Sequence, residues 1–256
     1  HAVIEVASPD DITLIDLGNE PGTKVNGANI NKCKIKVGDQ IAETLVVHKR
    51  TSWRDARAQA LKLLEQVQVT DAARRLTQYP HELSGGMRQR VMIAIALACD
   101  PVMLIADEPT TALDVSVQAQ ILSLLKRLMR ERGMALALIT HDLGVVAGLA
   151  DHVTVLYAGR VVEAGTVRRL LKQPAHPYTA ALLRSMPRID ASVSEPLVAI
   201  RGQPPSPREL VGGCPFHPRC DLAQPRCAEE RPTLRSTAGA MVACHFPIAA
   251  SHGDLS

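Results

Sequence analysis

The chain has 256 residues, and its 29 Lys and Arg against 26 Asp and Glu leave a formal net charge of only +3. This balance argues against a nucleic-acid or membrane-surface protein, and aromatic residues at 2% leave few platforms on which bases could stack. The longest uncharged apolar run, VMIAIALAC at 91–99, is too short to span a bilayer, and no secretory signal opens the chain. We therefore expect a cytoplasmic protein, and the start at His1 without Met suggests a lost or processed N-terminus.

Residues 1–40 predict a small antiparallel β unit. AVIEVA, ITLIDL and CKIKVGDQI alternate apolar and polar residues, and Gly, Pro, Asn and Asp cluster between them. From about residue 50 the pattern becomes helical. Ser52 can cap a helix through about residue 67, and Thr70 or Asp71 opens a shorter helix that must end before Pro80.

From residue 84 onward, helices alternate with wholly apolar strands. The pattern predicts helices over 84–99, 115–132 and 142–150, strands over 102–106 and 134–140, and a hairpin over 152–165. Such alternation favours an α/β fold with a parallel sheet covered on both faces. Five prolines between about 186 and 212 indicate an extended linker, and the remaining Cys-rich tail reads as loops.

Four short motifs carry the chemistry of phosphate transfer. LSGGMRQR (83–90) offers glycine amides and a helix N-terminus to an anion, and VMLIADE (102–108) ends a strand in two carboxylates. The first carboxylate would bind Mg²⁺, and the second would orient or deprotonate the attacking water. TALD and LITHD follow, with a histidine that could reach the γ-phosphate. Each motif alone also suits a helix cap or turn, but the four in this order are specific. The candidate residues are Ser84, Gly85, Gly86, Asp107, Glu108, Asp114 and His141.

With these motifs, residues 41–185 resemble the second half of an ABC-type ATPase domain, including its signature, Walker B, D-loop and switch histidine. HPYTAALLRSMP (176–187) and the terminal cysteines are similar to the ATPase subunits of oligopeptide/dipeptide importers. This resemblance implies that two such subunits, identical or different, sandwich ATP and drive a transmembrane permease from the inner face of the plasma membrane. It also implies that Ser84 and Gly86 contact ATP bound to the opposing subunit. Met87 stands where the general signature has Gln.

The four terminal cysteines follow the spacing C-x5-C-x6-C-x16-C. Disulfides are unexpected in a reducing cytosol, and four thiolates in a loop-rich segment suit a [4Fe–4S] cluster or a structural Zn²⁺. The resemblance to the importers implies iron–sulfur, and plain reduced thiols remain an alternative. The proposed ligands are Cys214, Cys220, Cys227 and Cys244.

A phosphate-binding loop of the form G-x-x-x-x-G-K-[ST] does not occur in this sequence. The nearest segment, GTKVNG (22–27), is followed by Ala28-Asn29 rather than by Lys and a hydroxyl residue. Nothing else in the sequence would hold the β- and γ-phosphates, so we do not expect this chain to hydrolyse ATP by itself. The strand that normally precedes such a loop is missing with it, so we expect the strands at 102–106 and 134–140 to expose apolar surface.

Residues 1–40 instead resemble the last two-thirds of a forkhead-associated (FHA) domain, a β-sandwich that binds phosphothreonine peptides. His1 and the GTKVNG turns carry this resemblance, whereas Pro21 stands where the family has Asn, and its phosphate-binding Arg and Ser would precede residue 1. The whole chain is thus interpreted as a partial FHA-like fragment (1–40), the C-terminal half of an ABC ATPase domain (41–185) and an importer-type extension (186–256). A module for a phosphoprotein partner and an inactive chimera are the alternative interpretations.

Overall fold

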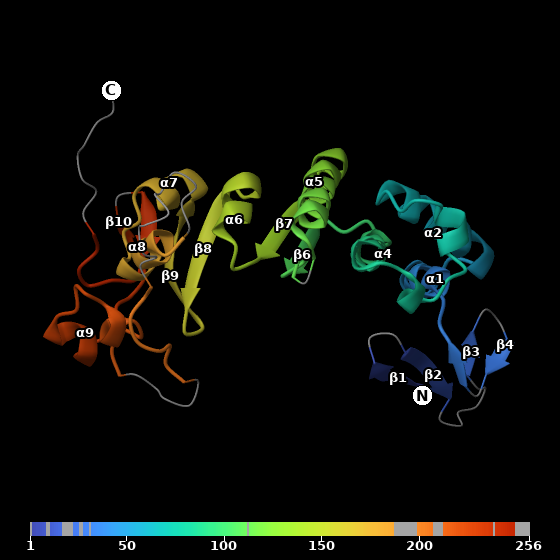
Figure 1. Cartoon of the computed structure of the whole chain (residues 1–256), viewed down its shortest axis with the longest axis horizontal. Coiled ribbons are helices and arrows are strands. Elements are labelled where there is room, and N and C mark those ends of the chain that lie inside the picture. The colour runs from blue at the N-terminus through green and yellow to red at the C-terminus, as the bar shows by residue number, and fades with distance from the viewer. Residues whose placement is uncertain are drawn as a thin grey trace. The chain divides into compact units, whose positions relative to one another are not determined.

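The structure is a computed structural model that describes residues 2–8, 11–16, 23–25, 28–30, 32–111, 113–186, 199–206, 212–237 and 239–248. It divides into two compact units, His1–Thr140 and His141–Ser256, which are described separately (Figure 1). The domain boundaries expected near residues 40 and 185 stay predictions. No described helix is long and apolar enough to cross a membrane.

The first unit combines short antiparallel strands, a group of helices and a parallel strand pair. The antiparallel strands form a sheet of order β1-β2-β5 and a separate hairpin of β3 and β4, which confirms the expected β unit at the start of the chain. The elements of this unit are β1 (Ala2–Ser8), β2 (Asp11–Asp16), β3 (Thr23–Val25), β4 (Ala28–Ile30), β5 (Lys32–Lys34), α1 (Val37–Lys49), α2 (Trp53–Gln66), α3 (Ala72–Arg75), η1 (Pro80–Glu82), α4 (Gly85–Leu97), β6 (Met103–Asp107), α5 (Val115–Arg132) and β7 (Ala135–Ile139).

Helix α1 corrects the expectation of a strand through Ile41. The strand β5 ends at Lys34, and residues from Val37 onward are helical. The reason lies in the spacing of the apolar residues, because Val37, Ile41 and Leu45 recur every four positions and are all fully buried. The alternation of apolar and polar residues in CKIKV therefore overlaps a segment whose apolar residues already have helical spacing.

The helices α1, α2, α4 and α5 enclose the core of the first unit, which also takes in Leu104 and Met134. Two of their predicted caps are confirmed, because Ser52 Oγ accepts a hydrogen bond from the Asp55 backbone and Ser84 Oγ accepts one from Met87. Gly133 ends α5 with a φ of 60°, a left-handed conformation that glycine adopts readily. The expected helix over 71–79 is present but shorter, as α3.

The strands β6 and β7 form a parallel two-stranded sheet, and the described residues add no third strand to it. Of the five residues of β6 only Leu104 is buried, whereas Ile105 is 68% exposed and Val102, just before the strand, is 88% exposed. Within the described residues of the first unit, this strand pair is therefore not covered on both faces, contrary to the expectation from the sequence. Among the described residues, Val102 and Ile105 are exposed as expected, whereas the loss of neighbouring strands from the domain stays a prediction.

The second unit is built on an antiparallel sheet of order β10-β11-β9-β8. The predicted hairpin is confirmed, and it turns at Ala158 and Gly159, whose φ values of 48° and 71° suit a tight two-residue turn. The elements are α6 (Leu143–Leu149), β8 (His152–Tyr157), β9 (Arg160–Thr166), α7 (Val167–Lys172), α8 (Pro177–Arg184), η2 (His217–Arg219), α9 (Pro225–Glu229), β10 (Arg235–Thr237) and β11 (Ala240–Val242).

The C-terminal tail is more regular than the expected loops. Its strand β11 pairs with β9 in antiparallel register, with Met241 opposite Ala164 and Val242 opposite Glu163. Helix α9 and the short helix η2 also lie in the tail. The tail thus extends the sheet that the hairpin begins. Strands of only three residues give too weak a sequence pattern to be predicted. The expected linker falls largely on residues 187–198 and 207–211, outside the described residues.

The few aromatic side chains of this protein concentrate in the second unit. Tyr157 of β8, Tyr178 of α8 and Phe216 of the tail contact one another, with ring centroids 4.6 to 5.3 Å apart. Arg219 donates a hydrogen bond to the Tyr157 hydroxyl at 3.2 Å and further bonds to backbone carbonyls of Ile200 and Arg201. This cluster fixes the tail against the hairpin and α8.

Candidate functional site

The glycine-rich motif lies at the start of α4, as the sequence predicts. Ser84 is the exposed N-cap, and Gly85 and Gly86 form the first turn. A Cβ atom on Gly86 would lie 2.6 Å from Val117 Cγ1 at the beginning of α5, so only glycine permits this close packing. The start of α4 therefore packs against the start of α5, and its backbone N–H groups face outward at a helix N-terminus, which suits an anion.

Asp107 is the last residue of the strand β6 and Glu108 follows it, and both carboxylates are exposed. The Glu108 backbone has a φ of 43°, and its N–H donates to the Ile139 carbonyl of β7 at 2.9 Å. The Thr111 hydroxyl donates to Glu108 Oε2 at 2.9 Å and orients that carboxylate. Asp107 and Glu108 thus stand at the carboxyl end of a parallel strand pair, where α/β folds bind ligands.

Asp114 caps α5 on the same unit. Its carboxylate accepts hydrogen bonds from the Val117 N–H at 2.9 Å and from the Ser116 hydroxyl at 2.8 Å. These bonds, chiefly the one from Val117, lower the pKa of Asp114. Asp114 therefore has a structural role as a helix cap in addition to the role that the D-loop resemblance implies.

His141 is the first residue of the second unit, and its side chain is exposed. The first unit thus brings Ser84, Gly86 and Asp114 close together through the packing of α4 on α5. Proximity of His141 to Glu108 stays a prediction. The FHA-like features, His1 and GTKVNG, have no described side chains, so phosphopeptide binding also stays a prediction.

The four terminal cysteines converge on one small space in the second unit, which we call the thiol cavity. Cys214, Cys220, Cys227 and Cys244 line it together with His176, His217, His245 and apolar side chains, and its volume is about 10 Å³. This volume is about that of one water molecule. Cys214 and Cys227 are also tied through the backbone, because the Cys214 N–H donates to the Cys227 carbonyl at 2.8 Å.

The described cysteines in this cavity are free thiols. Burial raises the pKa of Cys214 and Cys220, and it raises the pKa of Cys244 to about 11. Neighbouring cysteines add to each of these shifts, since one thiolate disfavours another nearby. The donor chemistry suits a thiophilic metal, although no group of three or more His, Cys, Asp or Glu among the described residues has the geometry of a metal site. Metal binding would therefore require the thiols to lose protons and move closer together.

Sequence reasoning missed two buried polar residues beside the thiol cavity. Glu163 on β9 is 0% exposed, and its two carboxylate oxygens accept the backbone N–H groups of Ala175 and His176 at 2.8 and 2.9 Å. His176 is 1% exposed and caps α8, and its Nδ1 accepts the Tyr178 N–H at 3.0 Å. The sequence pointed to His176 only through the HPY segment (176–178), which indicated a family resemblance and not a buried side chain. No local pattern marks Glu163 as buried.

The His176 ring is neutral near neutral pH. Burial lowers its pKa from 6.5 to about 4, and the backbone at Ala243 opposes that shift. The Ala243 contribution is a hydrogen bond with its backbone, which satisfies the buried ring.

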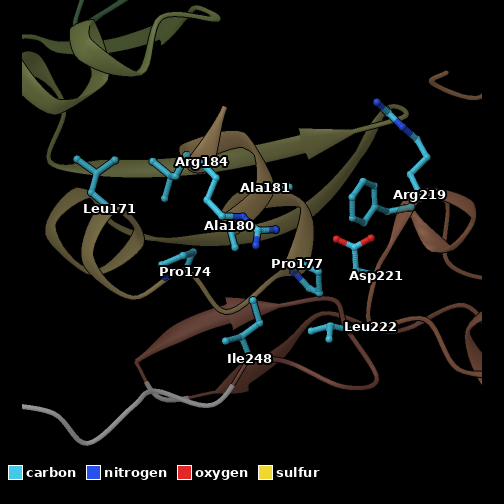
Figure 2. Close-up of a pocket in the computed structure, with 12 residues that line it drawn as sticks. Leu171, Pro174, Pro177, Ala180, Ala181, Arg184, Arg219, Asp221, Leu222 and Ile248 are labelled. Carbon is cyan, nitrogen blue, oxygen red and sulfur yellow. The ribbon is translucent and has the colours of Figure 1, made fainter. Parts of the chain in front are cut away.

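A larger cavity of about 580 Å³ lies next to the thiol cavity. Pro177 and Ala180 of α8 border it on one side, and Leu222 and Ile248 of the tail border it on the other (Figure 2). Its size is that of a small-molecule site, and its walls are mainly apolar. Part of the wall comes from the HPYTAALLRSMP segment (176–187), which contributes Pro177, Ala180, Ala181, Leu183 and Arg184.

Comparison with known proteins agrees with the architecture. A solved structure described as a metal-chelate type ABC transporter in an inward-facing conformation superimposes with a TM-score of 0.51 at 25% identity, covering 59% of this chain and 58% of the other. Residues 17–111 match the family model described as ABC transporter. This match begins inside the segment that we likened to an FHA domain. The fold is therefore α/β and ABC ATPase-like, with one parallel and several antiparallel strand pairings.

Within that class the chain resembles one group. Residues 162–227 match the family model described as oligopeptide/dipeptide transporter, C-terminal region. The oligopeptide transport ATP-binding protein OppD of Escherichia coli is 50% identical over 214 residues, which are 84% of this chain and 63% of the relative. AppD of Bacillus subtilis, also an oligopeptide transport ATP-binding protein, is 49% identical over 215 residues, with the same coverage. The chain thus spans less than two-thirds of these relatives' length, and it is similar to ATP-binding subunits of oligopeptide transporters.

Proposed function

We propose that this chain is the ATP-binding subunit, or part of it, of an ABC importer for oligopeptides or dipeptides, in which ATP hydrolysis energises uptake through a membrane permease. The observation that carries the proposal is the similarity to OppD, at 50% identity over 214 residues. A second support is that the motifs resembling those of ABC ATPases include the exposed side chains of Ser84, Asp107 and Glu108. The subunit would act on the cytoplasmic side of the membrane, beside the permease.

The residues would act in two groups. Asp107 would bind Mg²⁺, Glu108 would orient or deprotonate the attacking water, and His141 would contact the γ-phosphate or that water. Ser84, Gly85 and Gly86 would contact ATP held by a second ATPase subunit, identical or different. The side chains of Ser84, Asp107, Glu108 and His141 are exposed, which is consistent with sites that are completed by a partner.

The decisive test is nucleotide binding in the presence of a complete homologous ATPase subunit. Because the sequence contains no G-x-x-x-x-G-K-[ST] loop, we expect weak Mg-ATP binding by the chain alone and stronger binding by the mixture. Ser84→Ala should weaken ATP retention by the mixture. Ser52→Ala is the matched control, since Ser52 caps α2 as Ser84 caps α4 but lies outside the glycine motif. Tight Mg-ATP binding by the chain alone would disprove our view of the phosphate loop, and equal effects of the two substitutions would disprove the assigned role of Ser84.

We also propose that the cysteines of the thiol cavity hold a metal centre, either a [4Fe–4S] cluster or Zn²⁺. The support is that four thiols line one cavity, together with three histidines. When bound, such a centre would cross-link the tail to the hairpin and α8, a structural role in a segment with a small core. Iron and zinc content after anaerobic purification, together with visible absorption, would decide between the two. A protein that is fully folded and contains neither metal would contradict the proposal.

A further inference from the structure

The larger cavity, of about 580 Å³, is lined only by residues of the second unit. Pro177 and Ala180 of α8 line one side, and Leu222 and Ile248 of the tail line the other (Figure 2). Its volume lies in the range of about 300–1,000 Å³ that small-molecule sites occupy. The apolar walls would remove an apolar group of a ligand from water, which contributes roughly 25 cal/mol for each Å² buried.

Buried hydrogen bonds hold the two walls of this cavity in place. The Glu163 carboxylate accepts the N–H groups of Ala175 and His176 at 2.8 and 2.9 Å, directly before α8. The tail is attached to the same turn, because the Ile248 N–H donates to the Ala175 carbonyl at 2.8 Å. The cavity is therefore formed before a ligand enters, and a ligand would not have to order these walls.

The cavity also contains charged groups of both signs. Arg184 of α8 and Asp221 of the tail extend among the apolar side chains (Figure 2). Both side chains are exposed, and neither makes a hydrogen bond or an ion pair within the described part of the chain. Arg219, another charged residue of the wall, already donates to the Tyr157 hydroxyl and to two backbone carbonyls. Arg184 and Asp221 thus remain able to pair with a ligand.

These two charges restrict the class of ligand. An apolar anion such as a fatty acid would pair with Arg184 but would bring a like charge near Asp221, and an apolar amine would meet the opposite conflict. A zwitterion with apolar groups satisfies both charges. A single amino acid would leave much of the 580 Å³ empty. A short peptide with free ends has the required carboxylate, ammonium group and apolar side chains.

We propose that the larger cavity binds a short apolar peptide with free ends. The peptide carboxylate pairs with Arg184, its ammonium group pairs with Asp221, and its side chains contact the apolar walls. This inference goes beyond the proposed function, because none of the residues assigned to ATP lines the cavity and the peptide binds without nucleotide. A failure to bind peptide would leave the proposed retention of ATP with a second subunit untouched.

The test is isothermal titration calorimetry on the full chain without nucleotide, with leucyl-leucine as the probe. Two blocked peptides are compared with it: N-acetyl-leucyl-leucine lacks the ammonium group, and leucyl-leucinamide lacks the carboxylate. We expect the wild-type chain to bind leucyl-leucine roughly three- to tenfold more tightly than either blocked peptide, because each of these loses one charge-assisted contact with an exposed partner.

Variants assign each end of the peptide to its partner. Arg184→Gln should weaken binding of leucyl-leucine roughly three- to tenfold but leave leucyl-leucinamide unaffected, since that peptide has no carboxylate. Asp221→Asn should weaken leucyl-leucine similarly and leave N-acetyl-leucyl-leucine unaffected. Arg160→Gln and Asp151→Asn, at exposed residues of the second unit outside the cavity, are the matched controls and should change nothing.

A bulky substitution tests the position of the site. Ala180→Phe places a large side chain in the cavity, so binding of all three peptides should be lost while circular dichroism shows a folded protein. Wild-type affinity for leucyl-leucine in this folded variant would place the peptide elsewhere and overturn the inference.

Three further results would overturn it. Absence of binding by the folded wild-type chain at millimolar leucyl-leucine would remove the site. Tighter binding of N-acetyl-leucyl-leucine than of leucyl-leucine would show a site for apolar anions. Equal weakening of all three peptides by Arg184→Gln would show an effect on packing rather than on charge. The comparison of the three peptides on the wild-type chain needs no variant, so it decides the question even where a variant does not fold.

Discussion

The two main sheets of this protein differ in how many strands the described residues contribute. The sheet of β6 and β7 has two apolar strands in the described part of the chain, and the residues on either side of Leu104 are exposed. The hairpin of β8 and β9 is extended by β11 and β10, which come from the tail more than 70 residues later in the sequence. An apolar strand therefore indicates that a neighbour is required, but whether the neighbour exists depends on the rest of the chain.

The same contrast appears within the first unit. Helices α1, α2, α4 and α5 share a continuous core whose central side chains are fully buried, beside a sheet that is half open. Helices satisfy their own backbone hydrogen bonds and need only one apolar face covered, whereas strands need partners along both edges. We expect the helical core to carry most of the stability of this unit.

Leu125→Ala gives the largest expected effect and tests this division directly. Leu125 on α5 is fully buried in the helical core, so the substitution should lower the free energy of unfolding by roughly 2–5 kcal/mol. Ile105→Ala on the open sheet, at 68% exposure, should change it by less than about 0.5 kcal/mol. Denaturant unfolding measures both. A large loss from Ile105→Ala would show that the sheet is covered in solution.

Gly213→Ala tests how closely the tail packs on itself beside the thiol cavity. A Cβ on Gly213 would lie 2.1 Å from the Cys227 carbonyl oxygen, a backbone atom that cannot turn aside, so we expect a loss of about 3 kcal/mol or more. Gly212→Ala is the control, because its nearest atom would be 3.7 Å away. Unfolding followed by tyrosine fluorescence would compare the two. Equal stabilities would mean that the tail does not pack as described.

The pH dependence of the second unit should reflect His176. The pKa is about 4 in the folded protein and 6.5 as the reference for the unfolded chain. The unfolded state therefore takes up the proton first as pH falls, and stability that is complete above pH 6.5 is lost progressively down to about pH 4, by up to about 3 kcal/mol. His176→Gln should remove this part of the slope between those pH values. An identical slope in wild type and variant would contradict a buried neutral imidazole.

Gly86→Ala gives a smaller expected effect, in the contact between α4 and α5. The new methyl group would meet Val117 Cγ1 at 2.6 Å, so we expect a loss of about 1–3 kcal/mol. Adding Val117→Ala should restore part of that loss, since it removes the obstructing methyl groups. Gly148→Ala, in a helix with no atom within 4 Å of the new methyl group, should be neutral or slightly stabilising. Thermal unfolding would rank these variants, and a harmless Gly86→Ala would disprove the close packing.

Much of the fold was predictable wherever the signal was local. Ser52, Ser84 and Gly133 mark helix ends through their own chemistry, and the Ala158-Gly159 turn follows from residues that adopt positive φ. The start of α1 was missed because alternation and helical spacing overlap near Val37. The strands of the tail were missed because they have only three residues each, and they owe their conformation to pairing with β9.

The candidate site shows the same difference between what local sequence predicts and what tertiary contacts decide. Sequence order alone predicted Ser84, Gly86, Asp107, Glu108 and Asp114 as a group, and their action on ATP stays a prediction. The packing of Gly86 on Val117 and the capping by Asp114 show how the first unit positions that group.

The sequence by itself determined the local helix caps and turns, the order of the phosphate-transfer motifs and the presence of four cysteines in the tail. Only the tertiary structure decided that these cysteines share one cavity, and that Glu163 and His176 lie buried beside it. The physical reason is that capping and turn formation depend on a few adjacent residues. Burial and the closing of a sheet instead depend on groups that are distant in the chain and meet only on folding.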